Sequence, residues 1–342
     1  MNFTNLTSMP QIGIDETGQG CPHLWEHTNG WKYSFAGSFA LIVFLAVVGN
    51  ILVICTICRN PKKFRTIVHI FIANMAMSDI VGAIFIAPIR ISNALDVPFP
   101  LKGTLGAIMC PLSPFLSDSS FVVSVLTIII IAAERFQAVV FPRRHLLPFT
   151  QYRCLSIFTI WFIAFAFYSP YFYTKRLVSE DDEILCDTKW EPAFDPDISP
   201  RVYFVVDVIL FWAIPAILLV GMYGVVLIYL KRQGDNFRSM VSLERQRVRQ
   251  IRDQNISAML ITVTVAFYVT WSPFITFYLL VMFLPRALEI ILCHYNTLEF
   301  VFSLMATSNS AINPFIYFIL NKTYRCGMLQ LLSIVCSFHK IC

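Results

Sequence analysis

Residues 33–58 read YSFAGSFALIVFLAVVGNILVICTIC and hold no charged side chain. About 20 apolar residues in a helix are enough to cross the hydrocarbon core of a bilayer. Six further stretches have the same character, each with at most one charged residue: 66–89, 105–133, 154–174, 202–230, 254–285 and 290–320. They are too apolar, and alternate too little, to be strands of a membrane barrel. The sequence therefore predicts an all-α membrane protein with a bundle of seven membrane-spanning helices.

The composition agrees with a membrane protein. Apolar residues make up 57% of the 342 residues and charged residues 14%, against roughly 45–50% and about 25% in soluble domains. So few charges cannot cover the surface of a soluble protein of this size. The same numbers exclude disordered, collagen-like and disulfide-scaffold classes. The net charge of +5 is spread over the loops, so it gives no reason to expect a nucleic-acid partner.

The loop charges set the orientation. Of the 26 Lys and Arg residues, 18 lie in or beside the loops after the first, third and fifth spans and in the tail, and eight lie on the other side. Loops rich in Lys and Arg stay in the cytoplasm, so the amino terminus is expected outside, in a multi-pass protein of the plasma membrane. We predict an extracellular segment at 1–32, the bundle at 33–320, and a short amphipathic helix with a cytoplasmic tail at 321–342. The first 30 residues lack the basic and apolar regions of a cleaved signal peptide.

Several residues are suited to the oxidising outer side. Asn2 and Asn5 each begin a glycosylation sequon. Cys110 and Cys186 both face outside, so a disulfide between them is expected, and a second is predicted between the outer cysteines 21 and 293 (Cys21 and Cys293). The remaining cysteines are expected as packing residues in the helices (Cys55, Cys58, Cys154) and, in the tail, as either palmitoylated residues or free thiols (Cys326, Cys336, Cys342).

Short motifs occur at fixed places in the spans. They are, in order, Gly49-Asn50, the run from Asn74 to Asp79, Glu134-Arg135-Phe136, Trp161, Pro215 with Tyr223, Phe267-x-x-x-Trp271-Ser-Pro273, and Asn313-Pro314-x-x-Tyr317. This ordered set resembles the rhodopsin-like (class A) G-protein-coupled receptors over nearly the whole chain. The departures are Glu134, Phe136 and Thr270 where the family more often has Asp, Tyr and Cys. The resemblance implies a receptor that activates heterotrimeric G proteins, with arrestin and membrane lipid as further partners, and not an enzyme.

The resemblance also implies an ion site in mid-membrane. A buried carboxylate there is expensive, so Asp79 should have partners. The family pattern places Ser124, Trp271, Asn309 and Ser310 around it, and these groups could complete an oxygen cage for an allosteric sodium ion. The alternative is a polar cluster, with or without water, that joins the helices. No other metal or cofactor is expected.

Further residues match the activation switch of the family. Arg135 and Asp253 have the charges and depths of the pair that closes the inactive state, and the alternative is an unremarkable interfacial ion pair. Tyr223 and Tyr317 match the tyrosines that turn inward on activation, with Asn313 beside the second of them. Trp271, Phe267, Pro215 and Val125 match its mid-membrane packing switch. Without the resemblance, each of these would be interpreted as core packing.

The outer half narrows the class of ligand. The last span has no Lys to carry retinal, and Ser117 stands where amine receptors carry an Asp, with Asp118 one residue further on. Two β-prone runs at 171–179 and 184–190 flank an acidic turn, which predicts a hairpin and resembles the outer loop of peptide-gated members. Small-amine or other small-molecule recognition remains the alternative within the family, and an ion-coupled transporter the alternative outside it.

Charge on the outer side favours a cationic neuropeptide. Thirteen acidic residues face eight basic ones there, and Asp118, Asp207 and Glu299 continue the negative charge into the bundle. Phe274 and Tyr278 could stack on a guanidinium. A peptide that carries Arg beside an aromatic residue and ends in an amide would suit both features. The basic residues at 90, 175, 176 and 189 (Arg90, Lys175, Arg176, Lys189) argue the other way, because they could hold an anion.

Overall fold

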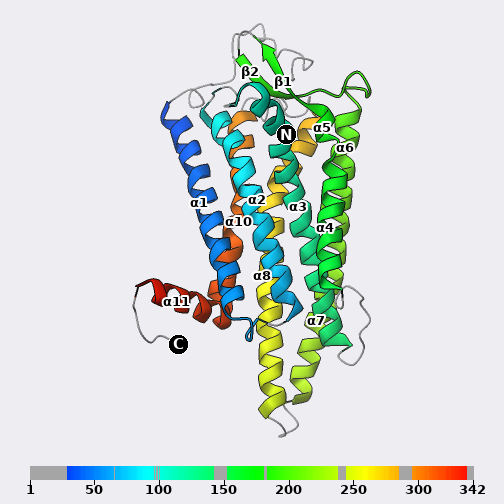
Figure 1. Ribbon diagram of the computed structural model, residues 1–342. Helices are drawn as coiled ribbons and strands as arrows, with labels where there is room; N and C mark the ends of the chain where they lie inside the picture. Colours follow the sequence, from blue (N-terminus) through cyan, green and yellow to red (C-terminus); the bar gives the residue numbers. More distant parts are fainter. Residues whose placement is uncertain are drawn as a thin grey trace, which may run out of the picture.

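The computed structural model describes the chain except residues 1–28, 65, 96, 98, 100, 142–151, 181–182, 238–243, 285–294 and 337–342. Only the backbone is described at 179, 180, 183, 233–237, 244–250, 252, 253 and 332–336. Within these limits long helices run side by side as a bundle, with a small hairpin at one end and a helix that projects to the side at the other (Figure 1).

The helices confirm the predicted spans. They are α1 (Asn29–Arg59), α2 (Ile67–Leu95), α3 (Gly103–Val140) and α4 (Arg153–Tyr168), then α6 (Ser199–Val208) continued through the π-turn η2 (Ile209–Ala213) into α7 (Ile214–Phe237), then α8 (Glu244–Phe283) and α10 (Tyr295–Leu320). Several exceed the predicted bounds because polar residues continue the helix beyond the apolar run. At the cytoplasmic end α7 and α8 project past their neighbours (Figure 1).

Six of the described spans are long and apolar enough to cross a membrane by length and composition, counting α6, η2 and α7 as one. The remaining one, α10, is richer in polar residues: Ser303, Thr307, Asn309, Ser310 and Asn313 lie along it. It lies in the bundle beside α1 and α8. Its Pro314 comes so close to Gly49 on α1 that a Cβ there would lie 2.9 Å from the proline ring, which explains a glycine at this position.

The predicted hairpin forms at the outer end. Strand β1 (Lys175–Glu180) pairs antiparallel with β2 (Glu183–Thr188), so that Leu177 lies opposite Cys186. The prediction began this run four residues too early, because residues 171–174 form the short helix α5 (Tyr171–Thr174) instead. The predicted disulfide between Cys110 and Cys186 is present, with 5.5 Å between the Cα atoms. It fixes the hairpin to the start of α3.

The predicted helix after the last span is α11 (Lys322–Cys336), which runs roughly perpendicular to the other helices and projects to the side past α1 at the cytoplasmic end (Figure 1). It is held close to α1, because a Cβ on Gly327 would meet the Thr56 side chain at 2.5 Å. Tyr324 is fully buried, and its hydroxyl lies 2.9 Å from Nδ1 of His69 on α2. A buried hydrogen bond therefore ties this helix to the bundle.

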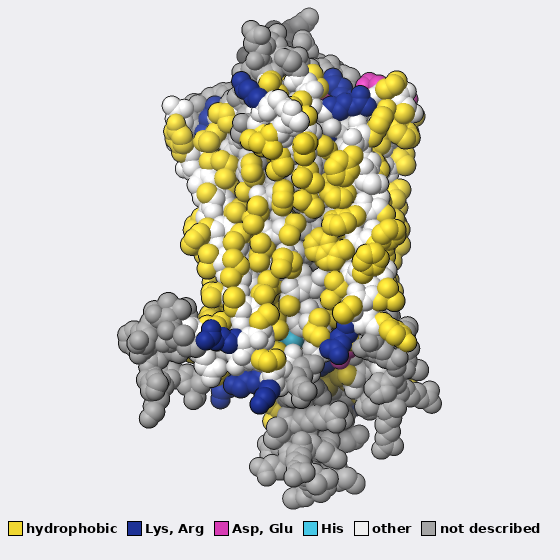
Figure 2. Space-filling view, in the orientation of Figure 1, with side chains coloured by type: hydrophobic (Ala, Val, Ile, Leu, Met, Phe, Trp, Pro, Cys, Tyr) yellow, Lys and Arg dark blue, Asp and Glu magenta, His cyan; other side chains and the backbone are white. Residues whose placement is uncertain are grey.

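The outer surface has the form of a membrane protein. Apolar side chains cover the middle of the bundle, and Lys and Arg side chains gather near its two ends (Figure 2). Cys55, Cys58 and Cys154 are exposed, so the prediction that they are packing residues in the helices is wrong. A small apolar thiol costs little where it faces lipid, and periodicity did not separate the two faces of helices this uniformly apolar.

Candidate functional site

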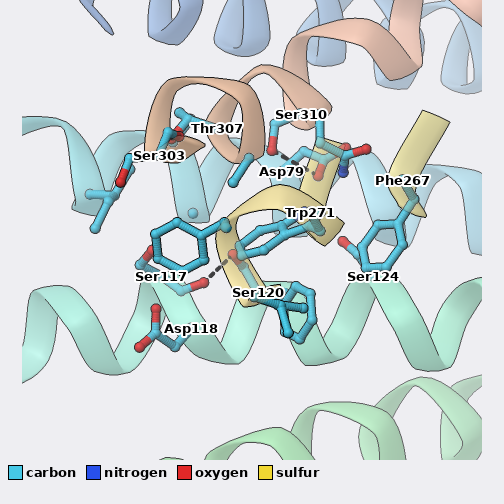
Figure 3. A pocket seen from close by; sticks show the side chains of 18 of the residues that line it. Asp79, Ser117, Asp118, Ser120, Ser124, Phe267, Trp271, Ser303, Thr307 and Ser310 are labelled. Atoms are coloured by element: carbon cyan, nitrogen blue, oxygen red, sulfur yellow. Dashed lines mark hydrogen bonds between the residues drawn. The ribbon is translucent and has the colours of Figure 1, made fainter. Parts of the chain in front are cut away.

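A cavity of about 110 Å³ runs inside the bundle from the outer half to mid-membrane. It is lined from α2, α3, α4, α6, α8 and α10. Among the predicted site residues, those that line it are Ser117, Asp118, Asp207 and Phe274 in the outer part and Asp79, Ser124, Phe267, Trp271, Asn309 and Ser310 further in. Figure 3 shows Asp79, Ser117, Trp271 and Ser310 around the same space. One cavity thus joins the predicted ligand site to the predicted ion site.

Two of the outer carboxylates are held by tyrosines. The hydroxyl of Tyr171 donates to Asp118 Oδ2 at 2.8 Å, and that of Tyr168 donates to Asp207 Oδ1, also at 2.8 Å. The two tyrosine rings are 5.3 Å apart, and Tyr203 lies 6.2 Å from Tyr171. Neither carboxylate forms an ion pair with a described residue. Each is therefore fixed in direction, while its negative charge has no ion-pair partner among the described residues.

The third outer carboxylate is differently placed. Glu299 Oε1 accepts a hydrogen bond from the Tyr278 hydroxyl at 2.9 Å and lies 3.4 Å from Arg90 Nη1. Of these three, only Arg90 lines the cavity. Tyr278 is 1% exposed, and its ring packs on Phe274 at 4.6 Å. The prediction grouped Glu299 and Tyr278 with the ligand-binding residues. In the structure neither lines the cavity, and they contact Arg90 and Phe274, which do.

Ser117 does line the cavity, at the position where an amine receptor would carry its acid. Its backbone carbonyl accepts the hydroxyl hydrogen of Ser120 at 2.6 Å. A neutral hydroxyl cannot replace the missing charge. Asp118, the next residue, also lines the cavity and turns toward Tyr171 on α5, so it does not take the place of that acid.

The inner part of the cavity is built around Asp79, which is 3% exposed. Ser310 donates to its Oδ1 at 3.1 Å and Asn313 to its Oδ2 at 2.9 Å. Ser124 and Asn309 line the same space, and Ser124 Oγ lies 3.0 Å from the Ser78 hydroxyl. No described Lys, Arg or His forms an ion pair with Asp79. A carboxylate with several hydroxyl and amide oxygens near it matches the ligand set of a hard cation.

Two of the predicted switch residues, Trp271 and Phe267, line the inner part of this cavity. Trp271 packs on Phe121 at 4.4 Å, and Phe121 stacks on Phe267 at 5.6 Å. The other members, Pro215, Tyr223 and Tyr317, are buried. Tyr317 lies 5.6 Å from the Tyr324 ring.

Arg135 lies at the cytoplasmic end of α3 and is 7% exposed. It donates from Nε to Glu134 Oε2 at 2.5 Å and from Nη2 to Glu134 Oε1 at 2.8 Å. Asp253 is on α8, but its side chain is outside the described part of the structure. The pair between Arg135 and Asp253 therefore stays a prediction.

A comparison with protein-family models identifies the chain. The model described as "7 transmembrane receptor (rhodopsin family)" matches residues 49–317. The chain belongs to the rhodopsin family of seven-transmembrane receptors. It is a G-protein-coupled receptor and a multi-pass protein of the plasma membrane, not an enzyme. This membership decides against the ion-coupled transporter.

Three relatives of the receptor have names that specify a peptide. The rat "Pyroglutamylated RF-amide peptide receptor" is 29% identical over 87% of this chain and 70% of its own length. The rat "Neuropeptide FF receptor 2" is 28% identical over 86% of this chain and 71% of its own. The human "Neuropeptide Y receptor type 4-2" is 26% identical over 84% and 76%.

Some predicted features of the receptor fall outside the described residues. They are the glycosylation sites Asn2 and Asn5, the second disulfide between Cys21 and Cys293, and the tail residue Cys342. They stay predictions, as does palmitoylation of Cys336. Cys326 is disulfide-bonded in the structure, so the prediction of a palmitoylated or free thiol at this position is wrong.

Sequence reasoning about the receptor missed the partners of its carboxylates. Tyr168 and Tyr171 were not singled out, and Arg90 was considered only as evidence for an anionic ligand. Arg90 and Glu299 are 209 positions apart in the chain, and Tyr168 and Asp207 are 39 apart. One signal was available: tyrosines at 168, 171 and 203 in mostly apolar spans need partners for their hydroxyls when buried.

Proposed function

We propose that this receptor binds a cationic peptide at the outer part of the cavity and thereby activates heterotrimeric G proteins. The observation that carries this is the pair Asp118 and Asp207, two carboxylates on one cavity without an ion-pair partner among the described residues. A charge in a membrane bundle is costly unless it is paired. A cation brought by the ligand would supply the missing partner. The names of the relatives support a peptide as its carrier.

A guanidinium suits this pair better than a compact ammonium. Each carboxylate already accepts one tyrosine hydrogen bond, so oxygens in two different directions remain to be filled. A planar guanidinium presents five donors and can serve two acceptors at once. The aromatic rings of Phe274 and Tyr168 on the same cavity offer faces for a cation or for a neighbouring aromatic side chain. A terminal amide would avoid adding a negative charge near these acids.

Cells that express the receptor with a promiscuous G-protein reporter test the proposal. Peptides ending in Arg-Phe-amide should activate, and the same peptides ending in a free carboxylate should be weaker. Acidic peptides and small amines serve as comparisons. Activation by a small amine at lower concentrations than by any amidated peptide would favour the small-molecule alternative.

We further propose that the inner part of the cavity holds a sodium ion in the inactive receptor, at Asp79 with Ser124, Asn309 and Ser310. The absence of an ion pair at Asp79 among the described residues supports this. By linkage, an ion that favours the inactive state lowers agonist affinity. Replacing sodium by a bulky organic cation at constant ionic strength should raise agonist affinity in the wild type and have no effect in Asp79→Asn. Equal affinity in both salts for the wild type argues against the ion.

On the cytoplasmic side, we propose that Arg135 is released to the G protein when the lower part of α8 moves outward. Pro273 removes one backbone hydrogen bond within α8 and so gives the helix a place to bend. The basic inner loops suit an acidic surface on the G protein or arrestin, or anionic lipid.

A further inference from the structure

A second cavity, of about 80 Å³, lies under the hairpin between α2 and α3. Its walls come from α2, from Pro114 on α3 and from Val97 and Phe99 between those helices. Leu185 and Cys186 of β2 close it. The disulfide to Cys110 holds β2 in place, and the Phe99 N–H donates to the Ile184 carbonyl at 3.1 Å. Covalent and backbone bonds on two sides therefore define a built cavity with room for a few water-sized groups.

The charges on this cavity are opposite to those on the first. Its described lining includes Arg90 and Lys175 and no carboxylate. Arg90 is 8% exposed and Lys175 6%. Two cations of this kind are rarely found so deeply buried together without an anion.

Neither cation is fully satisfied by its protein partners. The long contact to Glu299 occupies Arg90 Nη1, while Arg90 Nε is buried with no hydrogen-bond partner among the described residues. Lys175 Nζ donates to Thr188 Oγ1 at 2.6 Å, a neutral acceptor, and lies 5.7 Å from the Tyr171 ring centre. Buried N–H groups of charged side chains nearly always have an acceptor.

The pKa of Lys175 also indicates that its ammonium group is not fully compensated by nearby carboxylates. Burial lowers the pKa of Lys175 to about 8, against the attraction of Asp118 and Asp187, and the repulsion from Arg90 lowers it further. The two carboxylates therefore do not fully compensate the ammonium. Asp187 is also drawn to Lys189, 3.7 Å away.

We propose that this second cavity is a binding site for a small monovalent anion, a carboxylate or a halide, held between Arg90 and Lys175. The anion accepts hydrogen bonds from Arg90 Nε and from Lys175 Nζ and neutralises the charge that these two residues share. The site is distinct from the carboxylate pair proposed for the ligand, because neither Asp118 nor Asp207 lines the second cavity. The outer half of the receptor then has two sites of opposite charge preference. Asp118 and Asp207 bind a cation, and Arg90 and Lys175 beneath the hairpin bind an anion.

Chlorine NMR on the purified full-length receptor tests the site. The sodium concentration and ionic strength are kept constant with methanesulfonate as the replacement anion. Chloride should show a saturable broadening of its resonance, and acetate should reverse it if the site also accepts carboxylates. Broadening that acetate does not reverse assigns the site to a halide. Broadening that acetate reverses means that the site accepts both halides and carboxylates, and a carboxylate group of a ligand could then occupy it.

Variants locate the effect. Lys175→Gln and Arg90→Gln should each weaken chloride binding about tenfold or more, because each removes one of the two charges. Lys189→Gln is the matched control: its lysine is on the same loop and forms an ion pair with Asp187, but it does not line the cavity. Broadening in the wild type that does not saturate, or that is equal in all the variants, overturns the proposal. The wild-type titration stands even if a variant fails to fold.

Discussion

The three outer carboxylates differ in what already neutralises them. Asp118 and Asp207 have tyrosine hydroxyls, whereas Glu299 has Arg90 as well. Their positions in mostly apolar spans were enough to single them out, because a charged side chain inside a membrane is costly and is usually functional. Their individual partners come from distant helices, and only the packed bundle determines which acid faces which cation.

Loss of Glu299 should therefore act through Arg90. Glu299→Gln leaves the Arg90 guanidinium, whose side chain is 9% exposed, on the cavity without its counter-ion. It then repels a cationic ligand, and we expect agonist potency to fall at least about tenfold, in line with 2–5 kcal/mol for breaking a buried charge pair. Adding Arg90→Gln should restore most of the potency. Concentration–response curves at matched surface expression measure both. A double variant weaker than Glu299→Gln alone would mean that Glu299 contacts the ligand itself.

At the scale of elements, the hairpin depends on its disulfide. The bridged cysteines are 76 positions apart, and closing a loop of that length contributes an estimated 3–5 kcal/mol in the chain-entropy model. Cys110→Ser should abolish ligand binding or delivery to the cell surface, measured by radioligand binding and surface labelling. Cys154→Ser, which removes an exposed free thiol, is the control and should behave like the wild type. Normal binding by Cys110→Ser would show that the hairpin holds its place without the bridge.

A buried hydrogen bond ties helix α11 to α2. Tyr324→Phe keeps the ring but removes the hydroxyl that lies 2.9 Å from His69 Nδ1. We expect a loss of about 0.5–1.5 kcal/mol, seen as a lower melting temperature of the purified receptor. Tyr229→Phe removes a hydroxyl from a tyrosine that is 41% exposed and should change the melting temperature much less. Equal melting temperatures for both variants and the wild type would mean that this bond adds no stability.

The spans and the hairpin could be predicted from the sequence, whereas the start of the hairpin and the lipid-facing sides of the helices could not. Uncharged runs of bilayer length determined the spans, and the hairpin followed from β-prone runs around an acidic turn. The start of the hairpin was wrong because Pro170 precedes Tyr171, and proline at the beginning of a helical turn favours α5. The lipid-facing sides of the helices could not be predicted, since they are as apolar as the buried sides and the hydrophobic pattern loses its contrast.

At the scale of the whole molecule, the balance between inactive and active states should depend on Asp253. If its carboxylate pairs with Arg135 in the inactive state, Asp253→Ala removes an interaction of about 1 kcal/mol and raises the active population about fivefold. Ligand-independent G-protein signalling at equal surface expression measures it. Gln254→Ala, an exposed neighbour on α8, is the control. Basal signalling equal to the wild type in Asp253→Ala would argue that Arg135 is held by Glu134 alone.

The central claim is that the receptor recognises a positive charge on its ligand through the carboxylates on the cavity. A double-mutant cycle tests it most directly, with wild type and Asp207→Asn against a peptide ending in Arg-Phe-amide and the same peptide with citrulline, the neutral isostere, in place of Arg. Asp197→Asn, an exposed outer acid, is the control variant. We predict that citrulline lowers potency at least about tenfold on the wild type and on Asp197→Asn but has little further effect on Asp207→Asn. An equal loss on all three receptors, or activation by an acidic peptide with a potency that Asp207→Asn leaves unchanged, would contradict the account.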